Sequence, residues 1–172
     1  MASESAYKDS HFLYFGFASN MNTTRIHIHN PTAVYIENGY LDDHELAFYV
    51  PYGEVGGWGG GSATLNDVKG KRAWGTIWKI GIENLASIDK QESVPNIYNR
   101  TVKEITTEKG EKVNCAIFTL NETAKVKEGE KPSPKYIQVI REGAKEHNIP
   151  KDYQEWLATI EDNGYNGNVA MP

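Results

Sequence analysis

One stretch decides the expected fold: Phe12-Leu13-Tyr14-Phe15-Gly16-Phe17-Ala18-Ser19-Asn20-Met21. Its apolar beginning predicts a short buried strand, and the small and polar residues that follow predict a turn at the end of that strand. Such a turn leaves several backbone N–H groups unpaired, and these groups can hold a carboxylate or an oxyanion. The more common alternative is an ordinary loop in which Ser19 or Asn20 caps a helix containing Arg25.

Strand patterns continue outward from this stretch. The further predicted strands, read from runs of β-branched and aromatic residues, span residues 33–40, 45–50, 72–80, 102–106 and 113–120. The turn-like residues 41–44 predict that the first two of these strands pair with each other. Trp74, Thr76 and Trp78 are expected on one face of their strand. The polar residues 108–111, with a glycine, predict a hairpin.

Helical patterns follow in the second half. One helix is expected within residues 81–91, and two more begin at Ser133-Pro134 and Ile149-Pro150, since a hydroxyl can cap a helix and proline suits its first turn. The apolar faces of the last two helices comprise Tyr136, Ile137, Ile140 and Ala144, and Tyr153, Trp156, Leu157 and Ile160. The chain therefore predicts an α+β fold with a curved mixed β-sheet or small barrel and flanking helices. We expect a single domain over residues 1–172, with residues 1–11 as a flexible N-terminus.

The composition narrows the class of protein. The chain has 172 residues and a net charge of −5, and no basic stripe is visible, which disfavours nucleic acid and anionic membranes as partners. The sequence shows no apolar run of membrane-spanning length, and its polar first residues do not predict a secretory signal. The single cysteine, Cys115, lies in an apolar stretch and is expected to be a buried strand thiol. We expect a cytoplasmic protein.

Two motifs suggest ligands only weakly. The glycine-rich residues 53–62 lack the Gly-Lys-Ser/Thr of a phosphate-binding loop, so we expect Trp58 to pack while the glycines allow close backbone approach beside a cavity. His27 and His29 form a possible metal pair on a strand. Because no carboxylate or cysteine obviously completes a ligand set, we expect structural or surface roles and no metal.

Glu92 is the candidate proton acceptor. It follows the predicted helix of residues 81–91, at an end where the helix dipole disfavours negative charge. A partly buried carboxylate there would have a raised pKa and would suit a general base. The alternative is a solvated acid at a helix end. Likewise, the Tyr136 hydroxyl either reaches a pocket or belongs to a core tyrosine.

The order and spacing of these segments resemble the γ-glutamylcyclotransferase family over nearly the whole chain. The family's substrate loop reads Tyr-x-x-Tyr-Gly-Ser-Asn-Leu, and residues 14–21 here read Tyr-Phe-Gly-Phe-Ala-Ser-Asn-Met. Further matching segments are residues 25–27, 30–31, 58–60, 63–64, 74–79, 85–94, 132–136 and 143–146. The match at residues 85–94 includes Glu92, at the position of the family's catalytic glutamate.

The resemblance implies an enzyme that converts γ-glutamyl amino acids to 5-oxoproline and a free amino acid, in glutathione turnover. It implies that Glu92 is the general base, with Tyr98 as a further candidate lining residue. The implied substrate-binding residues are Tyr14, Phe15, Gly16, Phe17, Ala18, Ser19 and Tyr136. The resemblance also implies a homodimer, and it requires neither a cofactor nor a metal.

Two departures from the family pattern keep alternatives open: the pair Phe17-Ala18, and a loop after Glu92 that is about one residue shorter than in the family. Phe17 lacks the hydroxyl of the family's tyrosine, and Ala18 carries a Cβ that would be unfavourable at positive φ. One alternative is a protein that keeps the pocket and binds γ-glutamyl compounds or pyroglutamate with little turnover. Another is a related cyclotransferase that uses glutathione or γ-glutamyl-lysine.

Overall fold

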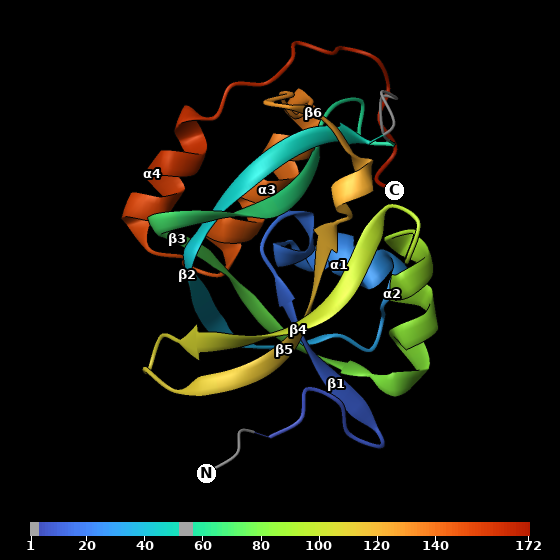
Figure 1. Ribbon diagram of the computed structural model, residues 1–172, viewed down its shortest axis with the longest axis vertical. Helices are drawn as coiled ribbons and strands as arrows, with labels where there is room; N and C mark the ends of the chain where they lie inside the picture. Colours follow the sequence, from blue (N-terminus) through green and yellow to red (C-terminus); the bar gives the residue numbers. More distant parts are fainter. Residues whose placement is uncertain (1–3, 52–56) are drawn as a thin grey trace.

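The computed structural model describes residues 4–51 and 57–172 (Figure 1). The strands are β1 His11–Gly16, β2 Val34–Pro51, β3 Ser62–Gly81, β4 Tyr98–Thr107, β5 Lys112–Leu120 and β6 Lys125–Glu128. The α-helices are α1 Thr23–His29, α2 Leu85–Gln91, α3 Pro134–Glu146 and α4 Lys151–Thr159, and short 3-10 turns are η1 Ser19–Met21, η2 Ile82–Asn84 and η3 Glu122–Ala124.

Five strands close into a small barrel. The sheet order is β3-β1-β5-β4-β2-β6, and β2 also pairs with β3, which joins the first strand of the order to the fifth. β1 runs parallel to β5 and the other neighbours are antiparallel, so the sheet is mixed. Within the part of the chain that the structure describes, β6 pairs with the far end of β2 alone, outside the ring. The expected α+β fold with a small mixed barrel and flanking helices is confirmed.

β2 corrects one prediction. Residues 33–40 and 45–50 do not form a hairpin, because one continuous strand runs through both and pairs with β3 along its length. The turn-like residues between them form a bulge instead: the register shifts between Asp42 and His44, and Asp43 has a φ of 60°. The extra residues lie on β3, where the four residues between Asp67 and Arg72 face the single Asp43, and the pairing of β2 with β3 continues on both sides.

The first strand lies between two hydrophobic cores. Successive side chains of a strand point to opposite faces, so Phe12 and Tyr14 join one core while Phe15 joins the other. The first core also contains Ile26, Trp78, Ile80, Ile88 and Phe118, from α1, α2 and the barrel. The second contains Ile77, Ile105, Ile137, Ile140, Tyr153 and Leu157, where α3 and α4 cover the long β2–β3 ribbon (Figure 1).

The start of α3 fixes the segment before β3. Ser133 caps α3 by accepting from the Tyr136 N–H at 3.2 Å, as expected, and its hydroxyl donates to the Trp58 carbonyl. A Cβ at Gly60 would lie 2.8 Å from the Ser133 nitrogen, so the close backbone approach requires glycine there. Trp58 is buried and stacks on Tyr136 at 4.6 Å between ring centroids. Residues 53–56 of the glycine-rich prediction lie outside the described residues.

The histidine pair was placed on the wrong element. His27 and His29 lie on α1, where residues two positions apart do not face each other. Nε2 of His27 lies 2.8 Å from the Ala33 carbonyl oxygen, a structural contact. Within residues 4–51 and 57–172 there is no group of three or more histidine, cysteine or acidic residues arranged to hold a metal ion. In the same residues, no helix is long and apolar enough to cross a membrane.

Candidate active site

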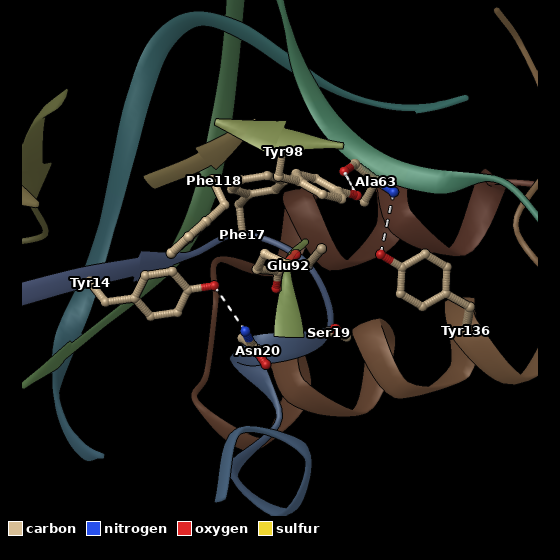
Figure 2. A pocket seen from close by; sticks show the side chains of 10 residues that line it. Tyr14, Phe17, Ser19, Asn20, Ala63, Glu92, Tyr98, Phe118 and Tyr136 are labelled. Carbon is tan, nitrogen blue, oxygen red and sulfur yellow. Dashed lines mark hydrogen bonds between the residues drawn. The ribbon is translucent and has the colours of Figure 1, made fainter. Parts of the chain in front are cut away.

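The turn after β1 opens into a small pocket with an empty volume of about 310 Å³, part of it open to solvent. Its lining residues come from β1 and the following turn, β3, the end of α2, β4, β5 and α3 (Figure 2). They are Tyr14, Phe17, Ala18, Ser19, Asn20, Ala63, Glu92, Tyr98, Phe118 and Tyr136. One carboxylate thus faces a mixed wall of phenols, phenyl rings and a Ser-Asn turn.

The turn itself is held by close backbone contact rather than by capping. A Cβ at Gly16 would lie 3.0 Å from the Asn20 carbonyl oxygen, so the chain folds back tightly there. Ala18 has a φ of −131°, so its Cβ causes no strain of the positive-φ kind. The N-cap of α1 is Asn22, whose side chain accepts from the Arg25 N–H. The expectation that Ser19 or Asn20 caps this helix is therefore wrong, and both side chains are buried beside the pocket.

Glu92 is the C-cap residue of α2, and its carboxyl faces the pocket. Desolvation raises the pKa of Glu92 to about 7, and the positive charge of Arg25 opposes that rise. The helix end that holds Glu92 also disfavours negative charge. A carboxyl group with a near-neutral pKa can accept and return a proton near physiological pH, which is what a general base requires.

Two phenols are arranged as hydrogen-bond donors to the pocket. Asn20 Nδ2 donates to the Tyr14 hydroxyl at 3.0 Å, and the Ala63 N–H donates to the Tyr136 hydroxyl at 3.3 Å. Each oxygen accepts a hydrogen bond, and no acceptor for either O–H group is found among the described residues, so both groups can donate to a ligand. Figure 2 shows Glu92 between these two tyrosines. Burial raises the pKa of both hydroxyls, which keeps them protonated.

Asn20 also supplies an acceptor. Its side chain is buried, and Oδ1 has no hydrogen-bond partner within the described chain although Nδ2 is paired with Tyr14. A buried unpaired amide oxygen is costly unless something binds it. Because Asn20 lines the pocket, this oxygen is suited to an N–H donor of a ligand. Tyr98 differs from the other phenols, since its hydroxyl donates to the Ala63 carbonyl at 2.7 Å.

The structure brings together most of the residues proposed from the sequence. Tyr14, Phe17, Ala18, Ser19, Glu92 and Tyr136 line one pocket, and so does Tyr98. Phe15 and Gly16 do not line it: the Phe15 side chain is buried in the core, and the Gly16 carbonyl accepts from the Thr76 hydroxyl. Cys115 is a buried thiol on β5, as expected, and desolvation raises its pKa to about 12.

Sequence reasoning missed three contributors. Ala63 and Phe118 lie on strands and carry no chemical motif of their own. Arg25 lies on α1, is buried, and has its guanidinium carbon 5.4 Å from the centre of the Trp58 ring. The available sign was one arginine in a short helix of threonine, isoleucine and histidine residues, but nothing in the sequence places it near Glu92.

Comparison with known proteins gives the class first. The profile of the AIG2-like family matches residues 72–157. A solved structure titled "Gamma-glutamyl cyclotransferase" superposes with a TM-score of 0.88 at 36% identity, covering 93% of this chain and 94% of that one. YkqA from Bacillus subtilis, at 17% identity and a TM-score of 0.70, shares the fold.

The curated relatives narrow the class further. The bovine protein named "Gamma-glutamylcyclotransferase" is 39% identical over 161 residues, which are 92% of this chain and 84% of the relative. The human protein of the same name is 37% identical over the same shares. The chain belongs to the γ-glutamylcyclotransferase family.

Proposed function

We propose that this protein is a γ-glutamylcyclotransferase that converts γ-glutamyl amino acids to 5-oxoproline and a free amino acid, with Glu92 as the general base. The observation that carries the proposal is the Glu92 carboxyl. This carboxyl has a pKa of about 7 and faces a small pocket lined by polar and apolar side chains. Two neutral phenols of the same pocket can donate their O–H groups to a ligand. Family membership supports the proposed reaction, and the geometry of the pocket supports the roles proposed for its residues.

The reaction needs little beyond positioning and one base. The substrate's α-amine and γ-carbonyl belong to the same molecule, so holding the folded conformer can supply much of the rate. Glu92 takes a proton from the α-ammonium, whose ordinary pKa is about 8. The free amine attacks the γ-carbonyl carbon and forms the C–N bond of the five-membered ring. The tetrahedral intermediate expels the acceptor amino acid when Glu92 returns its proton to the leaving nitrogen. Glu92 then takes the second proton from the positively charged ring nitrogen and passes it to the released amine, which regenerates the carboxylate.

The other pocket residues bind the charged groups of the substrate. Oδ1 of Asn20 accepts from the α-ammonium, which is the N–H donor that this unpaired oxygen lacks. The O–H groups of Tyr14 and Tyr136 and the backbone amides of the turn donate to the α-carboxylate and to the negative charge that develops on the γ-oxygen. Phe17 and Phe118 lend the pocket its apolar wall and exclude water.

The test is product formation. Purified wild-type protein is incubated with γ-glutamyl-alanine, glutathione and γ-glutamyl-lysine, and 5-oxoproline is quantified by mass spectrometry. We expect release from γ-glutamyl-alanine, and loss of that release by at least roughly 100-fold in Glu92→Gln, since a general base contributes about 10²–10⁴-fold. Glu155→Gln, at an exposed position of α4, is the matched control. Product from none of the three donors by folded wild type would refute the proposal.

The proposal extends to assembly and location. A homodimer is supported by family resemblance and by exposed apolar side chains at the end of α1 and the start of β2: Ile28, Val34, Tyr35 and Ile36. A cytoplasmic role in glutathione turnover suits a chain whose one cysteine cannot form an internal disulfide. Light scattering on the purified protein tests the first, since a monomer at micromolar concentration would contradict it. Cell fractionation tests the second.

A further inference from the structure

A chain of side-chain amides lies behind Glu92. Gln91 Nε2 donates to Glu92 Oε1 at 3.4 Å, and Asn30 Nδ2 donates to Gln91 Oε1 at 3.2 Å. Gln91 ends α2, and Asn30 is the C-cap residue of α1. Asn30 is fully buried and lies outside the pocket lining. The pocket carboxylate is thus connected to the end of a different helix.

A backbone carbonyl fixes the direction of this chain. Asn30 Nδ2 also lies 3.4 Å from the Ile26 carbonyl oxygen, which can only accept. The nitrogen of the Asn30 amide must therefore face Ile26 and Gln91. It follows that Gln91 presents its oxygen to Asn30, and that its nitrogen remains to donate to Glu92. Neither amide can be reversed without placing two acceptors or two donors against each other.

Asn30 is itself rigidly held. Its backbone N–H donates to the Ile26 carbonyl at 3.0 Å, and its own carbonyl accepts from the Ala33 N–H at 3.1 Å. Ser87 Oγ, from α2, lies 3.3 Å from Asn30 Oδ1. Asn30 is therefore hydrogen-bonded to both α1 and α2, and its hydrogen bond to Gln91 fixes the orientation of the Gln91 side chain.

We propose that Gln91, held by Asn30, is a positioning residue that orients the Glu92 carboxylate by occupying Oε1, so that Oε2 is reserved for the α-ammonium of the substrate. The role assigned to Oε2 rests on the proposed function, whereas the amide chain itself does not. A donor to the carboxylate favours its charged form, so Gln91 also holds the pKa of Glu92 below the value that desolvation alone would give.

The other groups around Glu92 do not substitute for this donor. The charge of Arg25, from α1, favours the carboxylate but makes no hydrogen bond to it in the described chain. Tyr14, Tyr98 and Tyr136 face the carboxyl from β1, β4 and α3 as neutral phenols. Among the described residues, Gln91 is the side chain that donates a hydrogen bond to the carboxyl of Glu92.

The test removes the donor and reads the carboxyl directly. The variants are Gln91→Met, which keeps the length of the side chain, and Gln91→Glu, which keeps an acceptor for Asn30 but places a second acid beside Glu92. Gln138→Met is the matched control, because Gln138 donates to Glu142 at 3.0 Å on the exposed surface of α3. In each full-length variant the Glu92 carboxyl is titrated by ¹³C NMR, its resonance assigned by its loss in Glu92→Gln. The pH profile of kcat/KM is measured in parallel.

The pKa of Glu92 is expected to be lowest in wild type, higher in Gln91→Met and highest in Gln91→Glu. From wild type to Gln91→Met we expect a rise of roughly half to one pH unit. The acid limb of kcat/KM should move with it, which lowers kcat/KM at pH 6 roughly three- to tenfold in Gln91→Met while KM changes little. Gln138→Met should match wild type in both measurements. A Glu92 titration that is unchanged in Gln91→Met would overturn the proposal, whatever Gln91→Glu shows, because a second acid raises the pKa of Glu92 by its charge alone. If wild type makes no 5-oxoproline, the proposed function fails, and the NMR titration still decides whether Gln91 acts on Glu92.

Discussion

The ionised Glu92 carboxylate should lower the free energy of unfolding of this protein. Its pKa is raised from 4.5 to about 7 in the folded protein, so the folded state accommodates the carboxylate less well than the unfolded chain does. The wild-type protein should therefore lose stability as the pH rises from about 4.5 to 7. Glu92→Gln, which has nearly the same shape and cannot ionise, should not suffer this loss.

The magnitude follows from the two pKa values. Each pH unit between them corresponds to about 1.4 kcal/mol, so the full difference at pH 8.5 is about 3 kcal/mol. This figure is an upper bound, because the pocket opens to solvent and Glu92 is only partly buried. At pH 5, where the folded carboxyl is already protonated, the same relation gives about 1 kcal/mol.

Urea unfolding followed by circular dichroism measures the effect at both pH values. We expect Glu92→Gln to raise the free energy of unfolding by up to about 3 kcal/mol at pH 8.5, or a Tm gain of roughly 6–12 °C, and by much less at pH 5. Glu155→Gln, on the exposed face of α4, should change neither value appreciably. An equal effect of Glu92→Gln at both pH values, or no gain at pH 8.5, would refute the reasoning that burial raises this pKa.

Three further results are expected. The wild-type kcat/KM should fall about tenfold between pH 6 and pH 5, because Glu92 must be deprotonated to act as the base. Arg25→Met should move this acidic fall of kcat/KM to higher pH, and Arg25→Lys should restore it, because the positive charge at position 25 lowers the pKa of Glu92. A pH profile that does not respond to the charge at position 25 would contradict the assignment of this fall to Glu92. Tyr136→Phe should lower kcat roughly 10- to 100-fold with an intact fold, measured with γ-glutamyl-alanine, whereas unchanged kcat would exclude its hydroxyl from the reaction. Ala18→Gly should lower the free energy of unfolding by about 0.5–1 kcal/mol in urea, since Ala18 has negative φ; stabilisation would mean that the family's glycine is needed there.

The strands and helices with a clear period could be predicted from the sequence. β1, the β4–β5 hairpin and the capped start of α3 follow from local patterns, because each is decided by residues close together in the chain. The continuous β2 could not be predicted. Asp43 is compatible with a turn or a bulge, and only the pairing of both halves with β3 decides between them.

The candidate site could likewise be predicted only in part from the sequence. The turn after β1 and Glu92 could be selected as candidates, since each belongs to a recognisable segment. Their meeting in one pocket depends on barrel closure, which sequence spacing does not contain. Arg25 and Asn30 escaped notice as neighbours of the acid for the same reason, because α1 and α2 pack together only in the folded protein.

The central claim is that Glu92 acts directly on the reacting amine. It is tested most directly by a crystal structure of folded Glu92→Gln with γ-glutamyl-alanine bound, since this variant should hold the substrate without consuming it. The account predicts the substrate's α-nitrogen at roughly 2.6–3.2 Å from the side chain at position 92, with its γ-carbonyl carbon facing that nitrogen. An α-nitrogen held away from position 92 and against a different acid would contradict it.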